Sequence, residues 1–588
     1  MAARTRQGAI VSNRAVGGYL SAIVSGASPP TPRLRFGVIV DRDAVPVWQS
    51  AVVRALLDGG DAEFGLLLRA RDTSDAGATS SRFSLWRLYN NGIVARRSRG
   101  VARAGSWTEL AAGVPELSVA VERRGRWSQH VTEPDLVAIR AAGLDFILRF
   151  GLGIIRGDVL DAARYGIWSF HHDDERVIRG GPPSFWELYD GLPTSGVLLQ
   201  RLTDRLDGGI PLARATFRSV LHSYPRNRDR SLLGAAGLPA QVARSIRLGL
   251  VDPNEIPVSA TDAPVRRNPT NAEMIKFFAT QTRRAIRVRA KGVLQADVWT
   301  VGIVERPAIG GGDVAVRSVE WLAEVKHSGY LADPFPARRD GRTAILVEEY
   351  DEESNRGVIS ALERVGDAWE LRSGVIDPGV HASYPFLVED GGELYCVPET
   401  WQSGRVELWR CVEFPVRWER AGVLVDGEAV VDPTVCEHEG RWWLFGTRKD
   451  DEPDAKLHVW SAPALAGPWT AHPLNPVKID VGSSRPGGTP VVVDGVLYRP
   501  AQDCSTAYGS AVVINRVVSL DERGLREEPA GRLVVPSGRY GSGTHTLAGA
   551  GDLWVVDGRR YGTNRHRRAR EIRSRLRRIL PARASRAN

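Results

Sequence analysis

Short apolar runs alternate with helical patterns along the first part of the chain. Residues 34–40 (LRFGVIV) form a continuous apolar run, which is typical of a strand buried on both faces of a parallel sheet. A helical pattern follows at 52–57, and a second apolar run follows at 64–68. The same alternation continues through residues 117–121, 135–142, 146–150, 157–164 and 166–171. This order predicts a βαβ fold with a parallel sheet.

The pattern changes twice beyond this region. Between residues 215 and 298 it becomes one of helices and charged loops. Within that stretch, residues 271–287 have apolar positions at helical spacing, with Asn271 as the expected N-cap. From residue 299 onward the apolar positions recur with a period of two, which indicates strands.

One motif returns along the period-two region as a strand, a turn that contains Gly, and a second strand. Its copies begin at Asp333, Tyr384, Asp432, Thr489 and Thr544. Each copy is a hairpin, and a hairpin is half of a four-stranded blade. The copies predict an all-β five-bladed propeller, in which the strand at 299–304 pairs into the last blade and closes the ring. A β-sandwich is the alternative, but it does not explain the regular return of one motif.

The chain has 588 residues, which is too many for a single hydrophobic core, so we divide it where the pattern changes. The expected parts are a disordered arm (1–32), an α/β domain (33–214), a helical extension or linker (215–298), the propeller (299–558) and a basic tail (559–588).

The positive charge belongs to the tail. Residues 559–588 hold 12 Arg and one Glu, a charge of 12 − 1 = +11, so the remaining residues sum to 9 − 11 = −2. Apolar residues of the tail share one helical face, as in basic helices that bind an anionic membrane surface. A solvated, disordered tail is the alternative. Nucleic acid is not expected as a partner, because Tyr561 is the one aromatic residue among these arginines.

Localisation is inferred from what the sequence lacks. No window approaches the roughly 18 apolar residues of a membrane-spanning helix, and the N-terminus has no sustained apolar segment. The four cysteines have no CxxC spacing and are expected to be reduced thiols. We therefore expect a cytoplasmic protein that contacts the inner face of the membrane, if at all, through its tail.

A glycine turn follows the strand at 146–150. Gly151, Gly153 and Gly157 lack the spacing of a dinucleotide-binding loop and its place in the first βα turn, so an NAD site is rejected. The segment 150–210 instead carries, in order, YG before a strand, a His that ends it, RG after a loop, SGV at the next strand and LDGGI. This series resembles the catalytic core of the folate-dependent formyltransferases, the methionyl-tRNA, glycinamide ribonucleotide and sugar-amine N-formyltransferases.

The resemblance implies a Rossmann-like formyltransferase domain with a catalytic trio of Asn-x-His and Asp. Carried over, His171 and Asp207 match, whereas Ser169 stands where the family has Asn, and the loop after His171 also departs from the family. The implied cofactor is 10-formyltetrahydrofolate. The residues expected to bind it are Phe150, Gly151, Gly153, Arg179 and Gly180. The alternative is that His171 and Asp207 are packing residues in a domain that no longer turns over.

The innermost strands of a propeller surround a central channel, so residues that open the repeated motif are expected to converge. The expected substrate-binding residues are Asp333, Glu399, Asp432 and His545. The repeats resemble the five-bladed propellers of arabinosidase- and xylosidase-type glycoside hydrolases, and more closely the propeller attached to plant glucosamine inositolphosphorylceramide transferases. This implies sugar binding, with tryptophans as platforms, or hydrolysis by the carboxylates. The alternative is that the acids only cap loops.

Three functions follow from these features. The first is formyl transfer from 10-formyltetrahydrofolate to an amine of an amino sugar or glycan precursor, with the propeller holding the glycan. The second is a non-catalytic glycan-binding protein with a degenerate formyltransferase domain, and the third is a glycosidase. No metal site is expected, since the sequence has no paired His at helical spacing and no Cys cluster.

Overall fold

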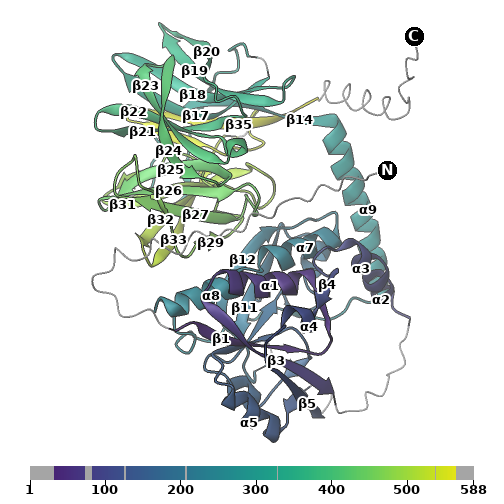
Figure 1. Cartoon of the computed structure of the whole chain (residues 1–588). Helices are drawn as coiled ribbons and strands as arrows, with labels where there is room; N and C mark the ends of the chain where they lie inside the picture. The colour runs from purple at the N-terminus through teal and green to yellow at the C-terminus, as the bar shows by residue number, and fades with distance from the viewer. Residues whose placement is uncertain are drawn as a thin grey trace, which may run out of the picture.

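The computed structural model describes residues 32–72, 83–124, 128–205, 208–327, 329–536 and 538–563. These residues form two lobes joined by the long helix α9 (Asn271–Leu294), as Figure 1 shows. The N-terminal lobe is a Rossmann-like α/β domain and the second is a five-bladed β-propeller, so the predicted fold class is confirmed. Most of the expected arm and tail lie outside the described residues.

The α/β domain is built on a nine-stranded sheet with the order β12-β11-β9-β7-β1-β3-β5-β6-β8. Its parallel central strands are β1 (Leu34–Val40), β3 (Ala62–Asp72), β5 (Glu116–Arg124), β7 (Phe146–Arg149) and β9 (Ile167–His171). The flanking strands are β6 (Ser128–Val131), β8 (Ile154–Ile155), β11 (Thr194–Arg201) and β12 (Ile210–Arg218). The direction of strand addition reverses between β1 and β7, which is where ligands bind in sheets of this kind.

Helices cover both faces of this sheet. On one face, α1 (Val47–Asp58) and α8 (Leu238–Arg247) pack against Phe36 and Val38 of β1. On the other face, α5 (Glu133–Ala141) packs around Ile39. Because β1 is buried on both faces, its sequence is a continuous apolar run, as predicted.

The remaining elements of this lobe are shorter or peripheral. They are β2 (Ala44–Pro46), β4 (Arg103–Ser106), β10 (Arg179–Gly180), β13 (Val265–Arg266), α2 (Leu85–Tyr89), η1 (Asn90–Val94), α3 (Ala95–Arg97), α4 (Trp107–Leu110), η2 (Asp158–Asp161), α6 (Trp186–Asp190) and α7 (Tyr224–Gly234). The helix predicted at 157–164 is reduced to η2, because Gly157 and Gly166 adopt φ values of 81° and 69° that a regular helix does not allow.

Each copy of the repeated motif forms the two inner strands of one blade. Blade 1 is β17 (Tyr330–Arg339), β18 (Arg342–Asp351), β19 (Arg356–Val365) and β20 (Ala368–Ile376). Blade 2 is β21 (Ser383–Asp390), β22 (Glu393–Glu399), β23 (Arg405–Glu413) and β24 (Arg417–Asp426), with η3 (Trp401–Ser403) between its middle strands. Blade 3 is β25 (Val430–His438), β26 (Arg441–Arg448), β27 (Lys456–Ala462), β28 (Thr470–Ala471) and β29 (Lys478–Ile479).

The last two blades include strands from the start of the propeller. Blade 4 is β30 (Val491–Val493), β31 (Val496–Asp503), β32 (Ala511–Asp521), β33 (Gly524–Val534) and β15 (Val314–Ala315). Blade 5 is β34 (Leu547–Ala550), β35 (Leu553–Thr563), β14 (Gln295–Val304) and β16 (Val319–Trp321). The pairing of β14 with β35 closes the ring, which confirms the prediction for 299–304.

The N-terminus of α9 corrects one prediction. The N-cap is Thr270, whose hydroxyl accepts the backbone N–H of Glu273 while the Glu273 carboxylate accepts the N–H of Thr270. Asn271 instead accepts a hydrogen bond from the backbone N–H of Leu85. The capping box satisfies two helix N–H groups at once and therefore outcompetes an isolated Asn.

The two lobes pack directly against each other. β12 is the edge strand of the sheet, and its Thr216 carbonyl accepts the N–H of Val481 from the propeller at 3.0 Å. Val481 and Cys504 join the same buried cluster as Ala215 and Phe217. Since β12 runs through the expected boundary at residue 214, the region after it is part of the lobe and of its interface.

Candidate functional sites

A cavity of about 160 Å³ lies at the carboxyl ends of β7 and β9. We call it the His171 cavity. It is bordered by β8 and by residues 202–205 and 209, and its lining includes Arg149, Ile154, Ile155, Phe170, His171 and Leu202. His171 is the last residue of β9, and its Nε2 lies 3.4 Å from the carbonyl oxygen of Ile178. The cavity thus combines apolar walls with several polar side chains, among them Arg149, Arg156, His171 and Asp204.

Arg149, and not Ser169, is the polar residue that lines the cavity beside His171. Ser169 is 1% exposed and does not line the cavity. Its hydroxyl accepts a hydrogen bond of 3.1 Å from Nε of Arg149, whose Nη1 donates to the carbonyl oxygen of Gly153. Burial lowers the pKa of the Arg149 guanidinium. Among the described residues no carboxylate pairs with this guanidinium, so its charge is directed at the cavity.

The sequence did not predict Arg149 as a site residue, because the family motif lies on β9 and Arg149 lies on β7. The available signal was its position: it ends β7, immediately before the glycine turn, where parallel strands present ligand-binding groups. The Arg149 side chain extends from the neighbouring strand β7 to the hydroxyl of Ser169, the residue at the motif position.

The other residues predicted to bind the cofactor lie in three places. Gly153 borders the cavity through its carbonyl contact with Arg149, while Gly151 packs against the backbone of Asp41. The ring of Phe150 packs between Trp48 and Trp107. Arg179 and Gly180 form β10, which pairs with β13, and the Arg179 guanidinium donates to Ala263. Asp207 lies outside the described residues, so its role stays a prediction.

Two buried carboxyls lie next to the His171 cavity. Asp173 and Glu187 are 1% and 2% exposed and face each other. Burial raises the pKa of Glu187 to about 7, and burial together with the neighbouring Glu187 raises the pKa of Asp173. Burial lowers the pKa of His172 to about 3, so this imidazole is neutral. Burial thus favours the neutral forms of these three groups.

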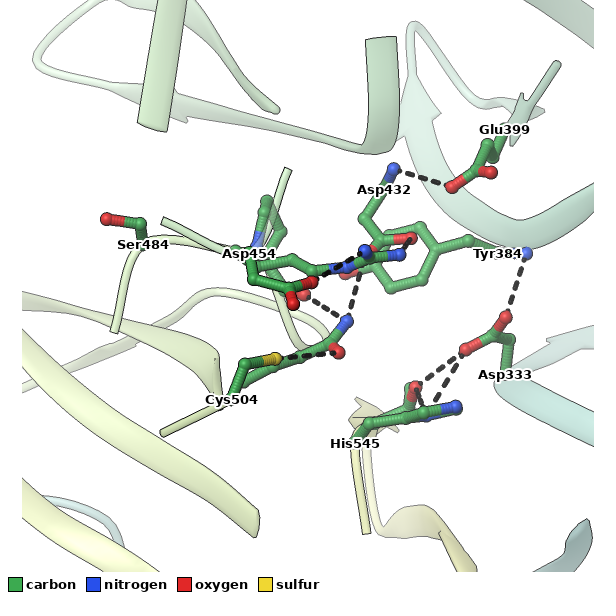
Figure 2. Close-up of polar contacts among 12 residues, drawn as sticks. Asp333, Tyr384, Glu399, Asp432, Asp454, Ser484, Cys504 and His545 are labelled. Carbon is green, nitrogen blue, oxygen red and sulfur yellow. Dashed lines mark hydrogen bonds and ion pairs between the residues drawn. The ribbon is translucent and has the colours of Figure 1, made fainter. Parts of the chain in front are cut away.

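The propeller contains a second polar centre, in its channel. Its acidic and imidazole groups come from four blades, and Figure 2 shows Asp333 next to His545 and Glu399 next to Asp432. The members of this central cluster are Asp333, Glu399, Asp432, His545 and Asp557. The convergence of the four residues that the sequence analysis named is thus observed, while their role in substrate binding stays a prediction. Asp557 of β35 was missed, because nothing in the motif distinguishes it from an ordinary strand residue.

Three carboxylates of the central cluster accept hydrogen bonds from backbone N–H groups. Asp333 accepts the N–H of Tyr384 at 3.3 Å, and Glu399 accepts the N–H of Asp432 at 3.0 Å (Figure 2). Asp557 accepts the N–H of His545 at 2.7 Å. Tyr384 and Asp432 have φ values of 44° and 50°, and the bonds hold these left-handed residues at a bulge of each inner strand. Asp333 and Glu399 therefore each connect two neighbouring blades, whereas Asp557 holds backbone within blade 5.

The side chain of Asp432 is also engaged. Its Oδ2 lies 2.6 Å from Nε of Arg485 and 2.7 Å from Nε2 of Gln502. Burial raises the pKa of Glu399, and the neighbouring Asp432 adds to the rise. Glu399 thus has the raised pKa that a general acid needs, but both carboxylates are committed to bonds within the protein. A hydrolytic role would require these bonds to break.

Asp333, His545 and Asp557 offer the ligand atoms for a metal ion. One oxygen or nitrogen from each lies within 4.8 Å of the others. Burial raises the pKa of Asp333 to about 6. Although burial disfavours the imidazolium, the carboxylates of Asp557 and Asp333 raise the pKa of His545. The two carboxylates therefore favour the protonated form of His545.

A chain of ion pairs leads from the central cluster to the α/β domain. Arg485 pairs with Asp432 and lies 3.5 Å from Asp454, which in turn lies 2.9 Å from Arg218 of β12. Tyr508 packs under the Arg485 guanidinium at 4.8 Å. The end of the channel that carries the central cluster therefore faces the other lobe.

Three of the tryptophans considered as sugar platforms belong to the hydrophobic core. Trp442, Trp443 and Trp460 are between 2% and 8% exposed and belong to buried clusters of blade 3. Trp401 is half-buried beside Lys449 and remains accessible.

The propeller matches a known family model. Residues 315–537 match the N-terminal region of glucosamine inositolphosphorylceramide transferase 1. The rice (Oryza sativa subsp. japonica) protein of that name is 34% identical over 211 residues, which are 34% of this chain and 28% of the rice protein. The propeller therefore resembles the N-terminal part of that transferase.

The α/β domain has a different relative. Methionyl-tRNA formyltransferase of Phenylobacterium zucineum is 32% identical over 117 residues, which are 20% of this chain and 38% of that protein. Among solved structures, glycinamide ribonucleotide transformylase 1 from Symbiobacterium toebii aligns over 41% of this chain and 100% of its own, with 17% identity and a TM-score of 0.28. The chain thus covers less than half of either curated relative.

Proposed function

We propose that the α/β domain transfers a formyl group from 10-formyltetrahydrofolate to an amine of an amino sugar or glycan precursor, and that the propeller binds the glycan. The observation that carries the proposal is the His171 cavity. It places an imidazole and a guanidinium at the carboxyl ends of adjacent parallel strands, in a domain similar in sequence to a formyltransferase.

The cavity suits one end of a folate. Ile154, Ile155 and Leu202 provide apolar walls for a planar ring, and Nε of Arg156, which lines the same cavity, is buried without a hydrogen-bond partner among the described residues. A volume of about 160 Å³ is below the roughly 300 Å³ at which sites for drug-sized ligands begin, so the ring end enters and the remainder lies outside.

When bound, 10-formyltetrahydrofolate supplies the formyl carbon that the acceptor amine attacks. His171 would take the proton that the amine loses and return it to the folate nitrogen as the bond between that nitrogen and the formyl carbon breaks, so that tetrahydrofolate leaves with the proton. Arg149 donates a hydrogen bond to the oxygen on which negative charge develops, and Ser169 positions the guanidinium by accepting from Nε. The permanent charge of Arg149 takes over the role of the amide that the family has at position 169.

The test combines ligand binding and transfer. Wild-type protein titrated with a stable 10-formyltetrahydrofolate analogue is expected to bind it, and to formylate a panel of amino sugars with the natural cofactor. His171→Ala is expected to keep binding and to lower transfer by about 10²–10⁴-fold. Arg149→Gln is expected to lower transfer by about 10²–10³-fold. His438→Ala, which alters an imidazole in the propeller, is the matched control and should leave both measurements unchanged. Absence of binding at millimolar analogue contradicts the proposal.

One observation favours a second function. Ser169 does not reach the cavity, so the family's amide has no direct replacement at its own position. A glycan-binding protein whose α/β domain does not transfer would show this. It would bind oligosaccharides through the propeller but not the folate analogue, and the titration above separates the two.

A further inference from the structure

Helix α9 packs against the α/β domain through its N-terminal part, and its C-terminal end continues directly into β14 of the propeller. Its first turns bury Met274 and Phe277 in the α/β domain, whereas every residue from 286 to 294 is exposed. In Figure 1 the helix runs along the side of the molecule from one lobe to the other. A helix with this exposure is expected to be polar all round, and α9 is not.

An apolar stripe runs along the outer face of α9. Its residues recur at intervals of three or four, which places them on one side of a helix. They are Ile275, Ala279, Thr282, Ile286, Ala290 and Val293, all exposed. Ile275 and Ile286 are 63% and 62% exposed, and the stripe extends for about 27 Å. Exposing an apolar surface of this kind to water is unfavourable relative to covering it.

The charge on α9 is of one sign. The helix has six cations, and Glu273, its one acid, is used in the capping box. Arg283, Arg287 and Arg289 flank the stripe and are exposed. Among the described residues none of the six cations pairs with a carboxylate, although arginines elsewhere in the molecule commonly do. A second copy of the chain would set these cations against each other, so self-association is disfavoured.

The described chain ends next to this helix. Thr563, its last residue, pairs with Gln295, which directly follows α9. The remaining residues, 564–588, contain ten arginines and one glutamate. Tyr561, 46% exposed, lies beside Lys291. Two basic segments and an interfacial aromatic residue therefore meet at one point.

We propose that α9 lies in the surface of an anionic lipid membrane, with its apolar stripe among the acyl chains and its cations among the headgroups. Charge complementarity identifies the occupant, because a neutral protein surface would cover the stripe and leave the cations unpaired. The inference is independent of the proposed formyl transfer. It adds a second membrane contact to that expected of the tail, and two contacts together bind far more stably than one.

The test is co-sedimentation of the full chain with vesicles of phosphatidylglycerol and phosphatidylcholine, against phosphatidylcholine alone. Binding is expected to the anionic vesicles and to weaken in 0.5 M salt. The pair Arg287→Gln and Arg289→Gln is expected to lower the partition coefficient about five-fold for each cation removed. Ile286→Ser is expected to lower it as well. The matched control, Arg410→Gln with Arg523→Gln, removes the same charge from exposed positions of the propeller and should have little effect.

A chain that ends at Thr563 separates the helix from the tail. It is expected to keep binding anionic vesicles, and to lose that binding when the α9 substitutions are added. The proposal is overturned if the full chain does not bind, or if binding depends on the tail alone. It is also overturned if light scattering shows a dimer that Ile286→Ser dissociates. Circular dichroism of each variant checks that α9 and the propeller are folded.

Discussion

At the scale of single residues, the proposed formyl transfer assigns to β7 a role that the family motif assigns to β9. Ser169 holds the motif position but is enclosed, and Arg149 on β7 presents the charge to the cavity. A guanidinium reaches farther than an amide and carries a permanent charge. Which side chain lines the cavity thus depends on side-chain length and on the register of β7 against β9, as well as on the motif.

The pair of Asp173 and Glu187 leads to a prediction on pH. Burial raises the folded-state pKa of Glu187 to about 7 from an ordinary value of 4.5, so the folded protein binds this proton more tightly than the unfolded chain. Wild-type stability should therefore fall as pH rises from about 4.5 to 7. Glu187→Gln is expected to raise the melting temperature at pH 8 by more than at pH 5. An equal shift at both pH values would contradict this assignment.

At the scale of elements, ring closure depends on close packing of small residues. Gly558 of β35 lies against Trp321 of β16, and a Cβ at that position would come within 2.2 Å of the Trp321 ring. In blade 5, a side-chain atom added at Gly558 would therefore clash with the Trp321 ring of the outer strand β16.

Gly558→Ala is expected to destabilise the propeller by about 1–3 kcal/mol, because the indole must move or the strand must shift. Gly422→Ala, in β24, is the matched control: its Cβ meets open space, and its effect should stay within about 0.5 kcal/mol. Urea unfolding followed by tryptophan fluorescence measures both. Equal effects would mean that the blade repacks freely.

The elements that the sequence predicted correctly are those whose apolar periodicity reflects burial. β1 lies between two helical layers, and the repeated hairpins line one ring, so their patterns are strong. The N-cap of α9 was misplaced by one residue, since Thr270 and Asn271 are both good caps and only the capping box decides between them. Arg149 was missed because it lies on β7, outside the family motif, and Asp557 because the repeated motif does not distinguish it from an ordinary strand residue.

At the scale of the whole molecule, the two lobes act as one body through β12. The chain of ion pairs from Asp432 through Arg485 and Asp454 ends at Arg218 on this strand. Apolar contacts of Val481 and Cys504 surround it. The cluster-bearing end of the propeller channel is therefore held in a fixed relation to the α/β domain.

Asp454→Ala is expected to lower stability by about 1–3 kcal/mol, because Arg218 loses its carboxylate and buried Arg485 keeps only one. Amide exchange should increase at the N–H of Val481, which donates to the Thr216 carbonyl across the two lobes. Asp450→Ala in the same loop, 63% exposed, is the control and should change stability by less than about 0.5 kcal/mol. If exchange at this amide is unaltered, the ion pairs do not hold the lobes together.

The pairing of β14 with β35 has a consequence for how the protein is made. β14 leaves the ribosome directly after α9, but its partner is among the last described residues to be synthesised. The α/β sheet is complete at Arg218 and is free to fold during synthesis, whereas β14 remains an open edge until the ring closes. During that interval the exposed edge strand is the part of the nascent chain most open to mispairing, and a chaperone that shields 295–304 would protect it.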